Sequence, residues 1–145
     1  MSAGAGRRIV QASWAGTALL AVATGLALFV GAAEVPATVI DLLLFLGGAV
    51  VFLWAYAIAV GRSRSVEIGI GGLYFVQGTA PAAVRRQLLG SLAAEVIIAG
   101  AAASLRPFSS FAFTILAPLW GLGLTGLWGA RHGTFQARRD GVGRT

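Results

Sequence analysis

The sequence predicts an all-α fold, a four-helix transmembrane bundle made of two antiparallel hairpins. Its composition, its four long apolar stretches and the placement of its arginines lead to this prediction. Of 145 residues, 57% are hydrophobic and only 11% are charged, whereas a soluble domain carries about 25% charged residues. A chain with so little charge cannot cover a globule with a polar shell. We therefore expect a single membrane domain over residues 1–145.

Four stretches are long and apolar enough to cross a bilayer. A spanning helix needs about 20 mostly apolar residues, because the hydrocarbon core is about 30 Å thick. The predicted spans are residues 13–33, 39–60, 88–105 and 108–130. For the first span, a cleaved signal peptide is the alternative. Arg7 and Arg8 would be its basic region, and Val30-Gly31-Ala32 its cleavage site.

The connections at one end of the predicted bundle are short. Residues 33–38 contain Pro36 and residues 106–110 contain Pro107, and proline stops helices. We therefore expect spans one and two to form one hairpin, and spans three and four the other.

The central loop, residues 61–87, is longer and unusual in composition. Its middle, residues 66–78, is apolar but too short to cross the membrane, which predicts a re-entrant or an interfacial segment. Residues 80–87 follow Thr79 and contain Pro81, an arrangement typical of a helix start. This helix is expected to continue into the third span.

Arginine is the only basic residue and gathers at alternate ends of the spans. Ten of the eleven arginines lie in three segments: Arg7 and Arg8 at the N-terminus; Arg62, Arg64, Arg85 and Arg86 in the central loop; Arg131, Arg138, Arg139 and Arg144 in the tail. Cytoplasmic loops are enriched in basic residues, so both termini are predicted to be cytoplasmic. The absence of lysine in an Ala- and Gly-rich chain indicates a bacterial source, and hence the bacterial inner (plasma) membrane.

Glu95 is the first candidate for a functional residue. It lies about 15 Å above Arg85 and Arg86 along a helix, near the middle of the membrane, where a charged side chain costs about 2.5–3.5 kcal/mol. One reading is a proton-carrying or cation-binding carboxylate. The other is a protonated side chain that makes an inter-helix contact.

Other polar residues have simpler readings. Asp41 is expected one turn inside its span, in reach of water, with a topology or capping role. His132 is expected to be water-exposed, and no metal site is predicted because suitable ligands are lacking. Arg62, Arg64, Arg85, Arg86 and Arg131 are candidates for contacts to lipid headgroups, or topology determinants alone.

Small residues in the last span predict close helix packing, at Gly121, Gly123 and Gly126. Pro118 predicts a kink there.

The sequence carries no recognisable catalytic set. It has no cysteine, no HExxH and no Ser/His/Asp arrangement in a polar context, and an intramembrane enzyme needs several converging polar groups. We therefore predict that the protein is not an enzyme, has no cofactor and binds no nucleic acid.

Two stretches, residues 79–86 and 117–135, resemble an uncharacterised small conserved transmembrane protein family of actinobacteria. The most distinctive run is Leu127-Trp-Gly-Ala-Arg-His-Gly-Thr-Phe135. The resemblance implies a membrane protein and no particular substrate.

Two functions fit these observations. The first is a non-catalytic accessory or scaffold subunit of a cell-envelope membrane complex, with a protein partner or further copies of itself in the lipid bilayer. The second is a small oligomeric transporter coupled through Glu95. A lipid-binding regulator that acts through the inner arginines is a third hypothesis.

Overall fold

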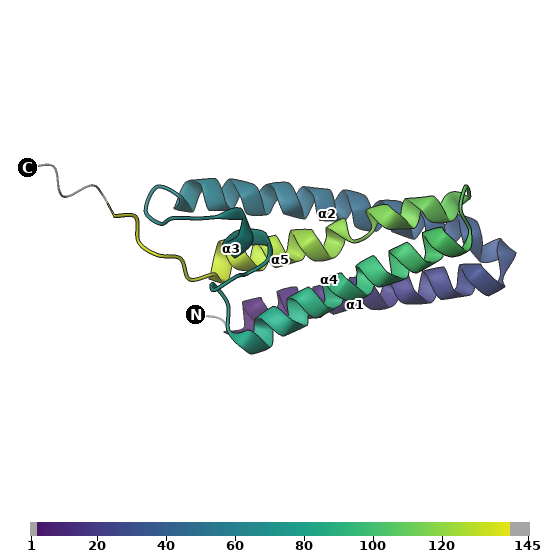
Figure 1. Ribbon diagram of the computed structural model, residues 1–145, viewed down its shortest axis with the longest axis horizontal. Coiled ribbons are helices and arrows are strands. Elements are labelled where there is room, and N and C mark those ends of the chain that lie inside the picture. Colours follow the sequence, from purple (N-terminus) through teal and green to yellow (C-terminus); the bar gives the residue numbers. More distant parts are fainter. Residues whose placement is uncertain (1–2, 140–145) are drawn as a thin grey trace, which may run out of the picture.

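A computed structural model describes residues 3–139 as an all-α, four-helix bundle (Figure 1), which confirms the predicted fold class. Arg144, part of the predicted basic tail, lies outside the described residues. The α-helices are α1 (Ala3–Phe29), α2 (Glu34–Arg62), α3 (Ile70–Tyr74), α4 (Ala82–Leu105) and α5 (Leu119–His132). Two 3-10 helices complete the chain, η1 (Gly31–Ala33) and η2 (Ser110–Leu116). No β-strand occurs between residues 3 and 139.

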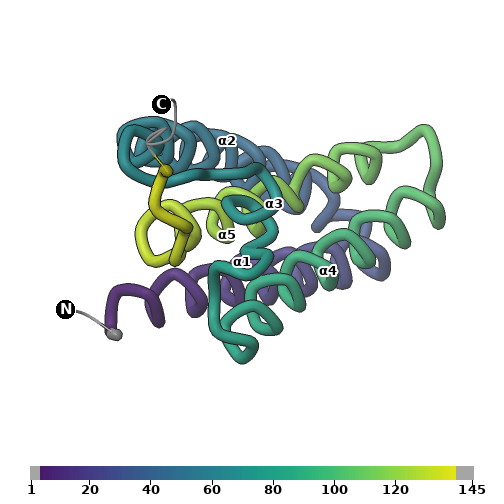
Figure 2. Tube along the Cα trace, turned by 60° about the vertical axis from the view of Figure 1, so that its left-hand side comes forward, coloured from purple at the N-terminus to yellow at the C-terminus, as the bar shows by residue number. Residues whose placement is uncertain are grey.

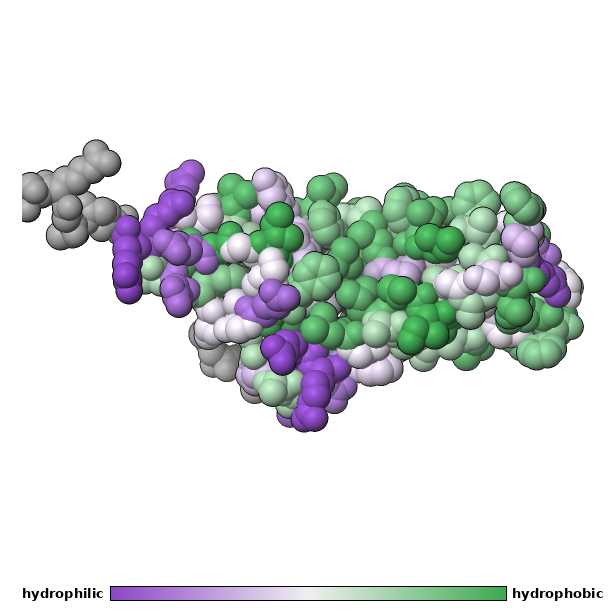
Figure 3. Space-filling model, viewed as in Figure 1, coloured by the Kyte–Doolittle hydropathy of each residue, from purple (hydrophilic) through white to green (hydrophobic). Residues whose placement is uncertain are grey.

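Four helical segments of the described chain are long and apolar enough to cross a membrane. They are Gly4–Phe29, Gly31–Arg62, Ala82–Leu105 and Ser110–His132. Apolar side chains cover most of the visible face in Figure 3, and hydrophilic ones gather mainly at the end where the described chain begins and ends. Both ends of the described chain lie at this same end of the bundle (Figure 1), as an even number of spans requires.

The connection between the first two spans is tighter than predicted. Residues 33–38 were expected to form a loop stopped by Pro36, but α2 already begins at Glu34 and contains this proline. Proline is tolerated in the first turn of a helix because the N–H that it lacks would have no partner there. The turn is instead made by η1.

The central loop folds back onto the bundle. Its short helix α3 packs against α5, and Leu73, Tyr74 and Val76 are buried. The start of the loop pairs with the tail: the N–H of Glu67 donates to the carbonyl of Gln136 at 2.9 Å. The helix predicted at residues 80–87 begins at Ala82, after Pro81, and continues as predicted into the third span.

The closest packing joins helices of different hairpins. α2 lies along α5, while α1 lies along α4 (Figure 2), and the α2–α5 contact is the most extensive in the bundle. Two glycines allow it: a Cβ at Gly123 would lie 2.6 Å from the carbonyl oxygen of Gly48. Small residues let helix backbones approach closely in lipid, where such packing drives association. Of the three glycines predicted to pack closely, Gly123 thus meets α2, whereas Gly121 meets Glu95 of α4 and Gly126 meets Tyr74 of α3.

Candidate functional site

The fourth span is broken near its middle rather than kinked. The 3-10 helix η2 ends at Leu116, and α5 begins at Leu119 with Pro118 before it. The first N–H groups of a helix have no partner within that helix. The break therefore places backbone donors of α5 inside the bundle, where they need acceptors. The N–H of Trp120 donates to the Ala117 carbonyl at 3.0 Å, whereas the N–H of Gly121 is paired by a side chain of another helix.

Glu95 supplies one of these acceptors. Its Oε2 accepts a hydrogen bond from the N–H of Gly121, in the first turn of α5, at 3.0 Å. Its Oε1 accepts one from the hydroxyl of Thr17 on α1, at 2.9 Å. The side chain is 1% exposed. Through these two hydrogen bonds Glu95 of α4 joins α1 and α5 at the break. The positive end of the α5 dipole also favours a negative group at this position.

Gly121 is necessary for this contact. A Cβ at this position would lie 2.7 Å from Oε2 of Glu95. A residue with a side chain here would therefore push the Glu95 carboxylate away from the N–H of Gly121.

Polar side chains continue from Glu95 along the α1–α4 interface. The hydroxyls of Ser13 and Ser91 are 2.5 Å apart, and both residues are fully buried. Thr17 lies between this pair and Glu95, and its hydroxyl also contacts the Ser13 carbonyl at 3.1 Å. Hydrogen bonds between helices hold membrane bundles together, and here they follow one row on α1 and α4.

Asp41 holds the other half of the broken span. Its Oδ2 accepts a hydrogen bond from the Thr114 hydroxyl of η2 at 2.8 Å. The expectation that Asp41 reaches water is wrong, because the residue is only 2% exposed. The reason is the early start of α2 at Glu34, which places Asp41 two turns inside the helix, where η2 covers it.

Two of the predicted inner arginines make contacts within the fold. Arg62 donates to the carbonyls of Ala130 at 2.6 Å and Gly133 at 3.1 Å. It thereby satisfies carbonyls at the end of α5, as basic residues near helix C-termini commonly do. The guanidinium of Arg131 lies over the ring of Trp54, 4.8 Å from its centroid. Arg64, Arg85 and Arg86 are exposed at the same end of the bundle.

His132 differs from its expected environment. It was predicted to be water-exposed, but it is partly buried and packs against Trp128, with ring centroids 5.6 Å apart. Within residues 3–139, no group of three or more His, Cys, Asp or Glu side chains is placed to hold a metal ion.

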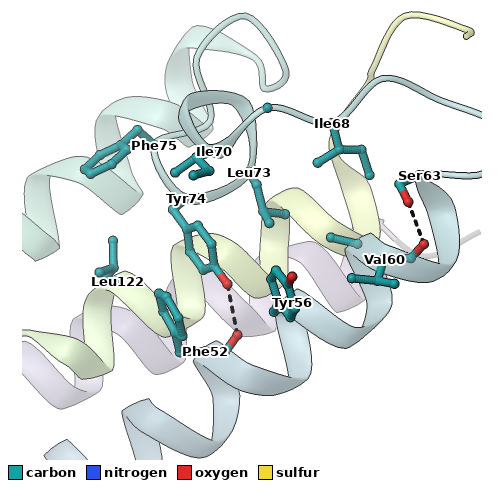
Figure 4. Close-up of a pocket in the computed structure, with 12 residues that line it drawn as sticks. Phe52, Tyr56, Val60, Ser63, Ile68, Ile70, Leu73, Tyr74, Phe75 and Leu122 are labelled. Atoms are coloured by element: carbon teal, nitrogen blue, oxygen red, sulfur yellow. Dashed lines mark hydrogen bonds between the residues drawn. The ribbon is translucent and has the colours of Figure 1, made fainter.

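A groove of about 450 Å³ lies between α2 and the α3 segment (Figure 4) and was not predicted from the sequence. Its walls are apolar, with Val60 from α2 and Ile68 and Leu73 from the loop. At one side Tyr74 stacks on Phe52 at 4.3 Å between ring centroids, and its hydroxyl donates to the Phe52 carbonyl. The apolar run at residues 66–78 was the available sequence indication.

These features define a class of protein without assigning it to a family. Four helices that are long and apolar enough to span a membrane make the chain a multi-pass membrane protein. No protein-family model, curated protein or solved structure matches the chain significantly.

Proposed function

We propose that this chain is a non-catalytic accessory or scaffold subunit of a cell-envelope membrane complex. One observation carries the proposal: the carboxylate in the middle of the third span is used to join helices. Both oxygens of Glu95 accept hydrogen bonds, from Thr17 and Gly121, and the side chain is buried. An acidic side chain that is costly to place in the membrane thus has a role in assembling the bundle.

The proposed location is the bacterial inner membrane, with both termini in the cytoplasm. The arginine distribution supports this orientation, because the exposed Arg64, Arg85 and Arg86 lie at the end where the described chain begins and ends and cytoplasmic segments are enriched in arginine. We also propose that the chain is related to the small actinobacterial membrane proteins that it resembles.

The orientation can be tested by cysteine labelling, since the chain has no native cysteine. Arg64 and Ala32 are both exposed and lie at opposite ends of the bundle. A membrane-impermeant maleimide added to intact spheroplasts is expected to label Ala32→Cys, but Arg64→Cys only after permeabilisation. The reverse pattern would reject the proposed orientation.

A second groove supports a partner within the membrane. It has a volume of about 450 Å³ and is lined by apolar side chains of four helical segments, including Phe45 from α2, Val96 from α4, Ile115 from η2 and Leu122 from α5. We expect a helix of another subunit, or of a second copy of this chain, to pack in this apolar groove.

Crosslinking in native membranes followed by affinity purification tests the accessory role. We expect defined protein partners, or copies of the chain itself, to co-purify through a photo-crosslinker placed at Val96. A crosslinker at Val22, an exposed position on α1, is the matched control and should capture fewer. Recovery of the monomer alone from both positions would contradict the proposal.

The alternative is a small oligomeric transporter coupled through Glu95. A specific observation favours it: discontinuous helices with half-helix ends near the midplane are common at substrate and ion sites of transporters. The fourth span is discontinuous, and Glu95 lies at the start of its second half.

Glu95→Gln separates these two functions. A transporter would lose its proton-dependent flux in proteoliposomes while its partners were unchanged. An accessory subunit would show no protein-dependent flux with either residue, and the variant would lose co-purifying partners if the bundle is loosened.

A further inference from the structure

A second polar cluster lies within the bundle, toward the end opposite to that at which the described chain begins and ends (Figure 1). Six polar side chains line one small void: Thr24 of α1, Glu34, Thr38 and Asp41 of α2, and Ser110 and Thr114 of η2. The space between these side chains has no room for a water molecule. It is therefore a tight space that these polar side chains line together with Ala37 and Phe111.

One of these oxygens has no partner. Oδ2 of Asp41 accepts the hydrogen bond from Thr114, whereas Oδ1 is buried and accepts no hydrogen bond from any described residue. Asp41 is 2% exposed. Buried polar atoms nearly always have a partner, because leaving one without any costs about 1–3 kcal/mol or more. Oδ1 of Asp41 therefore indicates a ligand in the void that it lines.

The other acid in the cluster is already engaged. The Ser110 hydroxyl donates to Oε1 of Glu34, and the Thr38 hydroxyl donates to the Glu34 carbonyl at 3.0 Å. Hydroxyl groups that donate a hydrogen bond keep lone pairs that can bind a cation. The described residues that line the void include no arginine or histidine, so its two carboxylates meet no basic side chain there.

We propose that this void is a binding site for a dehydrated, sodium-sized monovalent cation, held by Oδ1 of Asp41 and by hydroxyl oxygens that include Thr24. Hard cations bind carboxylate and hydroxyl oxygens. A sodium ion is smaller than a water molecule, so it is the alkali cation that we expect in a space that excludes water. A potassium ion is about as large as water and does not.

Divalent ions fit the site less well. Mg²⁺ retains several of its water molecules, and Ca²⁺ takes about 6–8 oxygen ligands. The void has no room for water, and one carboxylate oxygen of Asp41 is already used by Thr114. None of the residues in this site forms a hydrogen bond with Glu95, whose contacts carry the proposed function. The sodium site can therefore be tested separately from the role of the protein in a complex.

The ion would contact three separate elements and hold them together. Thr24, Asp41 and Thr114 come from α1, α2 and η2, and a ligand that binds only the folded state stabilises it. Sodium is therefore expected to raise the thermal stability of the purified protein.

The test compares thermal unfolding of the detergent-purified protein in NaCl, KCl and choline chloride at equal ionic strength. We expect the midpoint in NaCl to exceed that in the other two salts by about 4 °C, and ²²Na⁺ to bind at about one ion per chain. Equal midpoints in all three salts, with no ²²Na⁺ bound, would overturn the site.

Three variants locate the ion. Asp41→Asn should abolish both the shift and the binding. Because this variant can fail to fold, Thr24→Val removes one hydroxyl with little change of shape and should weaken sodium binding at least about tenfold. Thr125→Val, at a buried threonine of α5 that bonds to the Gly121 carbonyl, is the matched control and should keep the sodium response. An undiminished response in Thr24→Val and Asp41→Asn would show that sodium binds elsewhere and would reject the proposal.

Discussion

The carboxylate of Glu95 on α4 accepts a hydrogen bond from the backbone N–H of Gly121, at 3.0 Å, in the first turn of α5. The relationship explains how a transmembrane segment can be interrupted inside the bundle. Unpaired backbone donors are costly in lipid, and a side chain from another helix removes part of this cost. The opposing half of the same span is held by the contact between Thr114 and Asp41.

Replacing Glu95 should destabilise the bundle to a degree that depends on the new side chain. Glu95→Ala leaves the N–H of Gly121 and the hydroxyl of Thr17 without their acceptor, and we expect a loss of about 2–5 kcal/mol in the free energy of unfolding. Glu95→Gln keeps one carbonyl oxygen and should lose less. Unfolding in mixed micelles measures both, and equal stability of Glu95→Ala and the wild type would contradict the capping role.

Gly123→Ala should weaken the α2–α5 contact. The added methyl group would lie 2.6 Å from the Gly48 carbonyl oxygen, so the two backbones must separate, at a cost of about 1–3 kcal/mol. Gly100→Ala is the control, because nothing lies within 4 Å of that position and alanine favours helix by about 1 kcal/mol. The thermal unfolding midpoint should therefore fall for Gly123→Ala and rise for Gly100→Ala, relative to the wild type. An unchanged midpoint for Gly123→Ala would contradict the close packing.

The contact between Asp41 and Thr114 should appear as an energetic coupling. A double-mutant cycle with Asp41→Asn and Thr114→Val is expected to give about 0.6 kcal/mol, and at most about 1.7 kcal/mol, which are values typical of hydrogen bonds between membrane helices. The free energies of unfolding of the four proteins give this term. Additive effects of the two changes would show that the hydrogen bond adds no stability.

Arg62 and Arg64 should differ in their effect on stability although they are two residues apart. Arg62→Ala removes two hydrogen bonds to carbonyls at the end of α5 and should cost about 1–3 kcal/mol. Arg64 is exposed, so Arg64→Ala should change stability by less than about 0.5 kcal/mol. Chemical denaturation of both variants under the same conditions tests the difference, and similar losses would argue against the Arg62 contact.

Several features of the fold could be predicted because they depend on local chemistry. The four spans follow from runs of apolar residues that only a bilayer or a core accommodates, and the helix at residues 82–87 follows from Pro81 before it. The close approach of the last span was also predictable, because Gly123 lacks a side chain. The boundaries were less certain: Pro36 was expected to stop a helix but lies in its first turn.

The candidate site could be predicted only in part. Glu95 was identifiable as a costly residue in the middle of a span, but its partners Thr17 and Gly121 come from helices distant in the sequence. The burial of Asp41 was missed because it depends on η2, which lies about seventy residues further along the chain.

The sequence by itself therefore determined that this protein is a bundle of four apolar helices, with its arginines concentrated at alternate ends of the spans. Hydropathy and charge act on each segment separately, so no knowledge of neighbours is needed. Only the tertiary structure decided that the fourth span is broken and that Glu95 and Asp41 hold its two halves. A hydrogen bond requires both partners within about 3 Å, and helix packing alone brings these side chains together.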